Sequence, residues 1–466
     1  MKKGPLCQSC PAYGFSSHMV PDEIKPGAQI YLLNQAPGAN EEALGQPMVG
    51  KTGQAWESRF LKDAGLSRDQ INVGNVIRCR WHGTDELPPV SSVLVKAAMR
   101  HCQQAYFTIP PSTRLLVAAG DYACQALTGS TVADGDKAGS GWRGYLKPYD
   151  PITRESKAPQ KGSTALTEAP VGGYYLPSQG DIPVLVTWHV ARTFHEPKWI
   201  IPLKVDWGKV PRYLAGKWPI QPPRMLAQPP QPWPRMFTFD SEYDGETPKG
   251  AYPTLYRYSM CWGVGDEETC VVEAGQHRPA VSLYVVPPRV VMQYSPADVQ
   301  HLDRLTEIYG SIGLSVWDRF LIEDAVWKHA ILWSDHQHDL NYLGSLYTPF
   351  NRWKHLGGSH PTLYAGMDAT GLYYVDRALE QELDSDPRSR HVWETIDRPA
   401  LGEFVRAQYR GLRTDPDRVA SAIAQLQAEV DQSTLAARAI AGWPIKLSSN
   451  PMVADRLYAQ EDLKPS

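Results

Sequence analysis

The chain has 466 residues, of which 42% are hydrophobic and 15 are Trp, so it can build several packed cores. Its formal net charge is -3 and its pI is about 6.5, so no global basic field marks a polyanion-binding protein, and a nucleic-acid surface would have to be local. No apolar run approaches a membrane span, and the first residues lack the apolar core of a signal peptide. We therefore expect a cytoplasmic, multidomain protein with no membrane partner, whose seven cysteines are reduced thiols or metal ligands.

Short apolar segments alternate with helical stretches in the first 216 residues, which predicts a three-layer α/β domain with a mainly parallel sheet. The expected elements are, in chain order, a strand at 28–34, a helix at 55–65, a helix at 93–105, a strand at 114–120 and a strand at 182–189. Residues 147–180 are rich in Pro, Gly and Ser without apolar periodicity, and we expect a long surface insertion there.

A proline-rich segment at 217–235 holds seven prolines and predicts a semi-rigid extended connector between domains. After it comes the strand-like "RMFTFDSEYD", which opens a second α/β region reaching about residue 385. Residues 386–466 are expected to be helical. Apolar side chains that recur there at three- and four-residue steps predict a long amphipathic helix: Val419, Ile423, Leu426, Val430, Ala437 and Ile440.

The string "GQPMVGKT" at 45–52 fits the phosphate-binding loop pattern G-x-x-x-x-G-K-[ST]. That pattern binds phosphate only where the loop leaves a strand directly and opens a helix. Here ten residues that include a Pro-Gly pair separate the expected strand at 28–34 from Gly45. We interpret the string as a coincidence of glycines and a lysine.

Four cysteines form a candidate metal site. Cys7 and Cys10 make a C-x2-C pair, Cys79 follows an expected strand, and Cys102 lies in a helical stretch. Four thiolates suit zinc or an iron–sulfur cluster, and their spacing does not choose between them. The alternative is that the last two are ordinary core residues. The remaining cysteines have no pairing pattern and are expected to be buried apolar residues: Cys124, Cys261 and Cys270.

Several segments in order, over about residues 1–215, resemble the family 4 uracil-DNA glycosylases: "CQSC", "LNQAPGANEEALGQPMVGKTGQAW", "NVIRC", "HC" and "TWHVARTF". The resemblance implies that the four cysteines carry a [4Fe-4S] cluster, with zinc as the alternative. It also implies that Asn75 is the uracil-reading amide, that His189 is the histidine of the later motif, and that Glu41 occupies an acidic family position.

Two residues depart from that family. Gln35 stands where the family has a carboxylate, and an amide neither activates water nor stabilises an oxocarbenium-like centre well. Met48 stands where the family stacks the flipped base on an aromatic ring. The sequence leaves open whether this domain excises uracil or keeps the fold for DNA binding or architecture.

A second constellation consists of acids and one tyrosine. Asp240 and Glu242 lie two apart on an expected strand, so both side chains leave the same face. Two such carboxylates repel each other unless a cation lies between them, which indicates a hard metal site, with a solvated strand edge as the alternative. Asp298 follows a later apolar run, and Tyr364 and Asp368 lie four apart on an expected helix.

These segments, over about 235–385, resemble the RNase H-like (DEDDy) 3′–5′ exonuclease domain of family A, DNA polymerase I-like enzymes. That domain has a D-x-E motif, a second motif that ends in Asp, and a Y-x3-D motif. The approach to Asp298, "QYSPAD", is the weakest part because the family has an Asn-rich approach. The resemblance implies hydrolysis with two Mg2+ or Mn2+ ions about 3.5–4 Å apart, held by the four acids, with Tyr364 orienting the water and a nucleoside 5′-monophosphate as product.

Residues 386–466 resemble the thumb segment of family A polymerases, and a generic helical tail is the alternative. The palm and fingers with their catalytic aspartates do not follow, so we expect a separate polymerising chain as partner, an arrangement associated with bacteriophage polymerases. The expected substrate is DNA, at a primer 3′ end or a single strand. Candidate phosphate contacts are Arg100, Arg114, Arg143 and Lys204.

Three functions therefore stay open. The first is a metal-dependent 3′–5′ exonuclease that proofreads for a family A polymerase. The second is a uracil-DNA glycosylase, and the third is a non-catalytic, DNA-binding subunit of a split polymerase.

Overall fold

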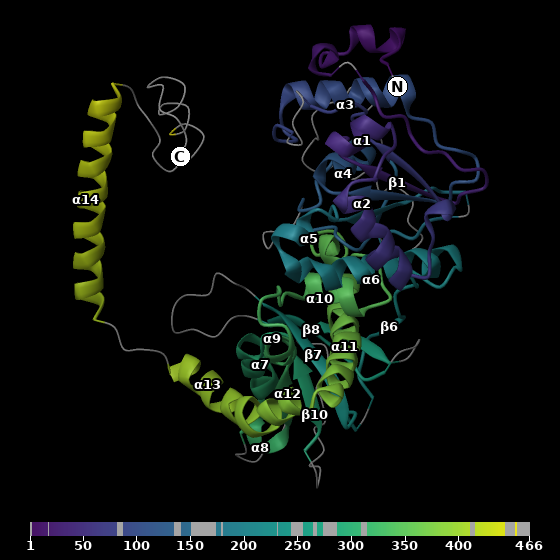
Figure 1. Cartoon of the computed structure of the whole chain (residues 1–466). Coiled ribbons are helices and arrows are strands. Elements are labelled where there is room, and N and C mark those ends of the chain that lie inside the picture. Colours follow the sequence, from purple (N-terminus) through teal and green to yellow (C-terminus); the bar gives the residue numbers. More distant parts are fainter. Residues whose placement is uncertain are drawn as a thin grey trace. The chain divides into compact units, whose positions relative to one another are not determined.

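The computed structural model describes residues 2–16, 18–81, 87–134, 141–150, 174–178, 180–230, 232–243, 255–263, 268–273, 287–308, 315–410, 415–442 and 453. The chain divides into two compact units, Met1–Glu403 and Phe404–Ser466 (Figure 1). The first unit contains two separate β-sheets, and the second is helical where it is described. The expected mixed α/β class with a helical C-terminal region is confirmed, whereas the expected domain boundaries at 216, 235 and 385 stay predictions.

The first sheet has the strand order β2-β1-β3-β5-β4 and is parallel except for β4, which pairs antiparallel with β5. Its strands are β1 (Ile30–Asn34), β2 (Ile71–Asn75), β3 (Leu115–Ala119), β4 (Leu146–Lys147) and β5 (Val184–Thr187). Every residue of the four parallel strands is buried, which explains why β1, β3 and β5 are mostly apolar runs in the sequence, whereas β2 also buries Asn72 and Asn75. The strands expected at 28–34, 114–120 and 182–189 are confirmed.

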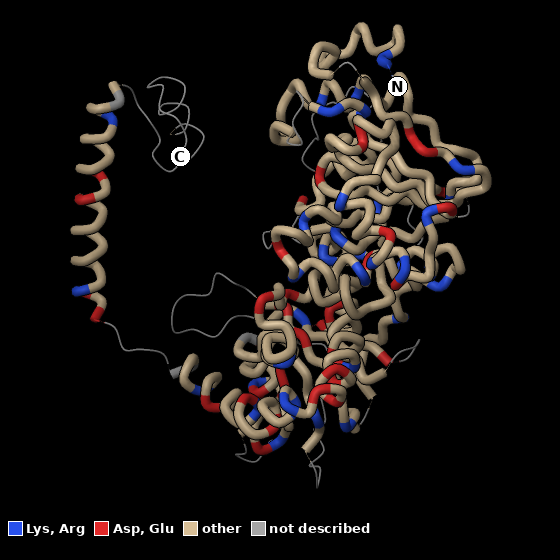
Figure 2. Tube along the Cα trace, in the orientation of Figure 1, with Lys and Arg blue, Asp and Glu red and all other residues tan. Residues whose placement is uncertain are grey.

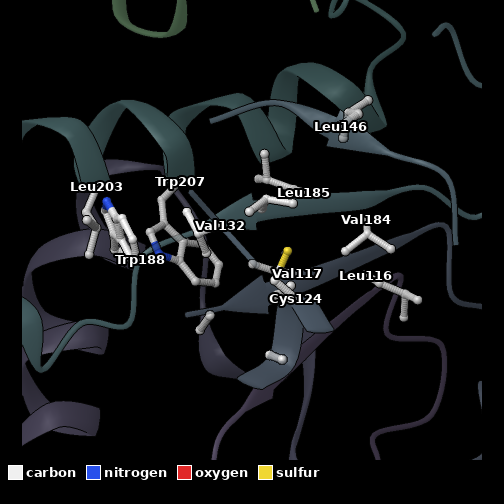
Figure 3. Packing of buried hydrophobic residues seen from close by; sticks show 14 of the residues in the cluster. Leu116, Val117, Cys124, Val132, Leu146, Val184, Leu185, Trp188, Leu203 and Trp207 are labelled. Atoms are coloured by element: carbon white, nitrogen blue, oxygen red, sulfur yellow. The ribbon is translucent and has the colours of Figure 1, made fainter. Parts of the chain in front are cut away.

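Helices cover this sheet, and α4 packs against β1, β3 and β5. The helices are η1 (Pro5–Ser9), η2 (Tyr13–Phe15), α1 (Ala39–Leu44), α2 (Lys51–Ala55), η3 (Trp56–Leu61), η4 (Arg68–Gln70), α3 (Val93–Tyr106), α4 (Asp121–Thr128), α5 (Arg192–His195), η5 (Pro197–Trp199) and α6 (Ile200–Leu214). In the core, Trp207 of α6 and Cys124 of α4 meet strand residues such as Val117 and Leu185 (Figure 3).

The string at 45–52 does not form a phosphate-binding loop. Gly45 ends α1 in the left-handed conformation, with φ 69°, and Gly50 precedes α2, which has only five residues. The string therefore joins two short helices instead of leaving a strand.

The second sheet has the strand order β11-β10-β7-β8-β9-β6 and is mixed. Its strands are β6 (Met225–Leu226), β7 (Met236–Tyr243), β8 (Leu255–Cys261), β9 (Thr269–Glu273), β10 (Arg289–Met292) and β11 (Leu321–Asp324). The helices of this half are α7 (Ser295–Ile308), α8 (Val316–Arg319), α9 (Ala325–Leu332), α10 (Leu340–Tyr347), η6 (Lys354–Leu356), α11 (Pro361–Ser385), α12 (Pro387–Val392), η7 (Trp393–Asp397) and α13 (Arg398–Arg410). The long helix α11 packs against β7, β8 and β9 (Figure 1).

The proline-rich segment 217–235 is not a free connector. Its residues Met225–Leu226 form β6 and pair with β9 at the edge of the second sheet. Trp218 and Trp233 from the same segment are buried. Burial of large indole side chains stabilises a packed conformation that the proline count alone conceals. Similarly, Tyr174, at the end of the expected surface insertion 147–180, is buried; residues 151–173 lie outside the described part.

A buried ion cluster fastens α9 and α11 to the second sheet. Lys328 Nζ lies 2.7 Å from Asp376 and 2.6 Å from Glu380, and it also pairs with Glu323. Arg289 Nη2 lies 2.8 Å from both Glu323 and Asp376. Arg390 Nη1 also lies 3.0 Å from Glu380, so three side-chain cations balance these three acids, and we assign the cluster a structural role.

The amphipathic helix expected near residues 419–440 is confirmed as α14 (Pro416–Ala441), which begins after the capping Asp415 and ends at Gly442 with φ 75°. Among the helices described, none combines the length and apolar character needed to span a bilayer.

Candidate functional site

Three carboxylates converge at the second sheet. Asp240 and Glu242 leave the same face of β7, and Asp368 reaches them from α11. One ligand oxygen from each lies within 4.8 Å of the others. Asp240 Oδ2 is buried and has no hydrogen-bond partner. Three convergent carboxylates with an orphaned oxygen form a donor set that suits a hard cation such as Mg2+ or Mn2+.

The fourth acid, Asp298, joins β7 from the first turn of α7. Its Oδ1 accepts hydrogen bonds from Ser241 N at 3.1 Å and Ser241 Oγ at 2.5 Å, and Ser241 separates the other two β7 positions in the sequence. Burial raises the pKa of Asp298 to about 8, although the Ser241 hydrogen bonds oppose that rise. The four predicted acids therefore gather around one strand.

The charges of these acids are mutually unfavourable without a cation. Burial raises the pKa of Asp240 well above its ordinary value, and Asp368 and Asp298 raise it further. Burial also raises the pKa of Glu242, again with a contribution from Asp368. A divalent cation between the oxygens would reverse this repulsion.

Lys354 and Trp353 hold the Asp368 carboxylate. Lys354 Nζ lies 2.7 Å from each carboxylate oxygen and donates to the Tyr364 hydroxyl at 3.1 Å. Trp353 Nε1 donates to Asp368 Oδ1 at 2.6 Å. Burial lowers the pKa of Lys354, but the nearby negative charge of Asp368 has the larger effect, so the pKa is raised. Burial raises the pKa of Tyr364. Neither side chain is marked in the sequence, because both lie between α10 and α11, outside every motif.

A cavity of about 540 Å³ opens beside the acids. Its lining residues are Asp240, Gln293, Tyr294, Val326, His338, Asp339, Leu340, Asn341, Arg352, Lys354 and Tyr364. A volume in this range accommodates a small ligand of nucleotide size. The cavity therefore brings together the predicted acid Asp240, the predicted Tyr364 and two cations.

The predicted residues of the first sheet lie at the carboxyl ends of its parallel strands. Asn75 ends β2 beside its register partner Asn34, and Gln35 follows β1 directly. His189 comes two residues after β5, where a Cβ on Gly120 would lie 3.3 Å from the His189 Cβ. The strand order reverses between β1 and β3, and the carboxyl edge at such a point is where open α/β sheets bind ligands.

Asn75 and His189 offer hydrogen-bond donors there. Asn75 Nδ2 is buried and has no partner. Burial lowers the pKa of His189 to about 4, so the ring is neutral at pH 7. Its Nδ1 accepts from Ala191 N at 3.3 Å, which assigns the remaining proton to Nε2.

Glu41 and Met48 have structural roles in the neighbouring loop. Glu41 Oε2 accepts from Gly38 N at 2.9 Å, and burial raises its pKa although hydrogen bonds from the Met48 and Val49 backbone oppose this. Met48 is buried with a positive φ of 53°, and its carbonyl accepts from Arg68 at 2.9 Å. Glu41 thus closes the loop that follows α1.

The four cysteines of the predicted cluster meet as expected. Cys7, Cys10, Cys79 and Cys102 line one small cavity together with Lys3 and Arg78, among others. Burial raises the pKa of the Cys102 thiol to about 12, so the thiolates needed for ligation require a bound cation. This donor set fits a metal or an iron–sulfur cluster. The other cysteines are buried, as predicted: Cys124, Cys261 and Cys270.

One predicted phosphate contact is wrong. Arg143 is fully buried, and its charge is balanced by Asp206 at 2.7 Å, so it cannot contact a phosphate at the surface. Lys204 pairs with Asp63 at 2.6 Å, and Arg114 donates to a backbone carbonyl at 3.1 Å. Basic and acidic residues are interspersed along the trace, as the small net charge requires (Figure 2). The contact proposed for Arg100 stays a prediction.

Comparison with known proteins identifies a relationship for the first sheet. Residues 21–200 match the Uracil DNA glycosylase superfamily. The type-4 uracil-DNA glycosylase of Sulfurisphaera tokodaii is 38% identical over 74 residues, which are 16% of this chain and 34% of that protein. The enzyme of the same name from Saccharolobus solfataricus is 35% identical over 74 residues, with the same coverage. The chain thus spans about a third of the length of these curated relatives.

Solved nuclease structures resemble the chain only weakly. A structure described as the apo form of the nuclease has a TM-score of 0.30 at 17% identity, covering 39% of this chain and 87% of that one. Brucella melitensis NrnC with bound Mg2+ has a TM-score of 0.27 at 18% identity, covering 37% and 81%. The N-terminal part of the chain contains a uracil-DNA glycosylase-like domain.

Proposed function

We propose that the second sheet and its helices form a metal-dependent 3′–5′ exonuclease that shortens DNA 3′ ends to nucleoside 5′-monophosphates. The observation that carries the proposal is the convergence of Asp240, Glu242 and Asp368 within 4.8 Å, from a strand and a helix more than a hundred residues apart. Asp298, fixed to the same strand by Ser241, completes the acid set of the RNase H-like exonucleases that the sequence resembles.

The chain's own residues then have distinct tasks. The four acids would hold two Mg2+ or Mn2+ ions, which supply Lewis-acid polarisation and charge neutralisation at the scissile phosphate. Tyr364, one helical turn before Asp368, orients the attacking water through its hydroxyl. Lys354 fixes that hydroxyl through a 3.1 Å hydrogen bond, and Trp353 fixes the Asp368 carboxylate.

The test is digestion of a 5′-labelled single strand by the full chain. We expect a ladder of shortened products with Mg2+ and none with EDTA. Asp240→Asn should lower the rate more than about 100-fold, because a metal ligand matters at least as much as its outer-shell partners. Asp69→Asn, at a side chain 94% exposed, is the matched control and should digest like the parent. A strand left intact by the parent chain with either Mg2+ or Mn2+ would refute the proposal.

We infer a second activity, uracil excision from DNA, for residues 21–200. Similarity to type-4 uracil-DNA glycosylases favours it, as do the unpartnered amide of Asn75 and the Nε2 proton of His189 at one sheet edge. Gln35 lacks the carboxylate that would activate water, so we expect excision to be slow. Gln35→Glu should raise the yield of alkali-sensitive nicks in uracil-containing DNA at least about tenfold, and Asn75→Ala should abolish it. Equal yields in all three proteins would contradict this activity.

We also propose that the four cysteines hold a [4Fe-4S] cluster, with a zinc ion as the alternative. Their thiols line one cavity, and four thiolates match the cluster's needs. Metal and sulfide analysis of anaerobically purified protein distinguishes the two. Iron together with sulfide would support the cluster, and zinc without sulfide would support a zinc site instead. Cys102→Ser should lower the content of either.

Finally, we propose that this chain works in the cytoplasm as the proofreading part of a bacteriophage-type family A polymerase, with palm and fingers on a separate chain. The support is the thumb resemblance of residues 386–466, where α14 is a long helix with an apolar stripe. Co-purification with a palm-containing chain tests the partnership, and its failure at micromolar concentrations would exclude a stable complex.

A further inference from the structure

Residues of the glycosylase-like domain contact the lining of the proposed exonuclease cavity. Asn341, which lines that cavity, donates from Nδ2 to the Gly141 carbonyl at 3.0 Å and accepts at its own carbonyl from the Tyr145 hydroxyl at 2.7 Å. Farther along, Asn351 exchanges hydrogen bonds with the Leu146 backbone at 2.8 Å and 3.1 Å. Residues 141–146, which lead into β4, therefore hold both ends of the segment 341–352.

One contact in this wall is a cation stacked on an aromatic ring. The Arg352 guanidinium carbon lies 4.8 Å from the centre of the Trp142 ring. Arg352 Nε also donates to Asn341 Oδ1 at 3.3 Å. Trp142 belongs to the glycosylase-like domain, whereas Arg352 lines the cavity with Asp240 and Lys354. The ring and the amide together restrict the orientation of the guanidinium.

A planar guanidinium at this place suits a phosphate. The cavity is lined by the carboxylates of Asp240 and Asp339, so a polyanionic strand needs cations in the same lining to enter it. Arginine is weakly hydrated and presents parallel donors to phosphate oxygens, and stacking on a ring pre-orders those donors. The contact between Trp142 and Arg352 would then affect the affinity for the strand and not the rate of the hydrolysis step.

We propose that Trp142 positions Arg352 to bind a backbone phosphate of the single strand that enters the exonuclease cavity. The glycosylase-like domain thereby contributes to the substrate affinity of the exonuclease. This inference rests on the proposed exonuclease function, and Trp142 acts as a positioning residue through Arg352.

The test measures equilibrium binding of a fluorescein-labelled oligothymidine to the full chain in EDTA, by anisotropy at several salt concentrations. Arg352→Gln should weaken binding about tenfold, as expected for a lost charge-assisted hydrogen bond. It should also reduce the slope of log K against log salt by about 0.7, the value for one phosphate of a single strand. Trp142→Ala should weaken binding in the same direction, whereas Trp142→Phe, which retains a ring, should lose less.

The double variant decides whether Trp142 acts through Arg352. In the Arg352→Gln background, Trp142→Ala should cause no further loss, whereas a merely structural tryptophan would give an additive loss. Arg377→Gln is the matched control, because Arg377 is exposed, lies over the Tyr373 ring at 5.9 Å and does not line the cavity. Its binding should equal that of the parent.

Three results would overturn the inference: no strand binding by the parent chain, unchanged binding in Arg352→Gln, or additive losses in the double variant. Failure of the exonuclease function gives a different result, because strands would still bind in EDTA but stay undigested after Mg2+ is added. Melting curves of each variant verify that it is folded.

Discussion

His329 and His338 illustrate what a single short contact fixes at the residue scale. Their Nδ1 atoms lie 2.7 Å apart, which requires one ring to donate and the other to accept, so the accepting ring is neutral. His329 is buried, and burial lowers its pKa to about 3, with His338 and His336 adding to the shift. The pair lies at the start of the cavity wall, since His338 lines the cavity.

We predict acid sensitivity from this pair. The folded pKa of about 3 lies below the unfolded value of about 6.5, so the stabilisation is complete above about pH 6.5 and is lost as the pH falls toward 3. The free energy of unfolding should fall by on the order of 2 kcal/mol between about pH 7 and pH 4.5 because of His329. Urea unfolding midpoints of His329→Gln should depend less steeply on pH, while the exposed-site control His195→Gln should behave like the parent. Equal slopes for all three proteins would contradict the prediction.

The pairs Asp240/Glu242 and Tyr364/Asp368 could be predicted from the sequence, because their two- and four-residue spacings are periodicities of a strand and a helix. Asp298 has no such spacing and was predicted only from the resemblance to the exonuclease domain. The roles of Lys354 and Arg352 could not be predicted from the sequence. Lys354 contacts Asp368 of α11 and Arg352 lies over Trp142 of the first half, and contacts between such distant segments leave no period in the sequence. The prediction of Arg143 as a phosphate contact fails for the same reason: nothing near it in the sequence shows that Asp206 is its partner.

At the scale of elements, α11 shows how glycines set a helix close to its neighbours. A Cβ on Gly371 would lie 2.7 Å from the Trp353 indole, and a Cβ on Gly366 would lie 2.2 Å from Met225 Sδ. Trp353 in turn donates to Asp368, one turn before Gly371. The close approach of helix and indole therefore also places a metal-ligand candidate.

We predict that Gly371→Ala destabilises the chain by about 1–3 kcal/mol, because the buried indole must move to admit the methyl group. The same displacement should lower exonuclease activity, since it disturbs the hydrogen bond to Asp368. Gly208→Ala in α6 is the control, because nothing lies within 4 Å of its Cβ position, and it should be neutral or stabilising by up to about 1 kcal/mol. Thermal unfolding of both variants checks the difference, and equal melting temperatures would refute it.

The buried strands of the first sheet follow from their continuous apolar runs, and α14 follows from its seam of apolar residues. The pairing of Met225–Leu226 with β9 does not follow, because proline content indicates a linker while the neighbouring buried indoles decide the packing. Local composition thus predicts elements better than it predicts which segments join a sheet.

At the scale of the whole molecule, the two sheet-containing halves share a hydrophobic core and also make buried polar contacts. Arg143 pairs with Asp206 and donates to Ser345 from the second half. Lys209 donates to the carbonyls of Gly144 and Ser345, both at 2.6 Å, and burial lowers its pKa to about 7. No periodicity links residues some 200 positions apart, so this interface could not be predicted from the sequence, although the two α/β regions could.

We predict that Asp206 is essential to this interface. Asp206 accepts from Arg143 at 2.7 Å and from the Thr187 hydroxyl at 2.7 Å, and both members of the ion pair are fully buried. Asp206→Ala leaves the Arg143 guanidinium buried without its counter-charge and should cost about 3–5 kcal/mol. Lys204→Ala removes a half-exposed ion pair on the same helix and should cost at most about 1 kcal/mol.

Chemical unfolding followed by fluorescence, with exonuclease activity as a second readout, measures the effect of Asp206→Ala. Because residues 1–403 form one compact unit, loss of this ion pair should lower the stability of both halves together, and exonuclease activity should disappear at the same urea concentration as the fluorescence change. If Asp206→Ala destabilises the first half while the exonuclease survives to the parent's urea midpoint, the two halves unfold independently. The ion pair would then stabilise the glycosylase-like domain alone.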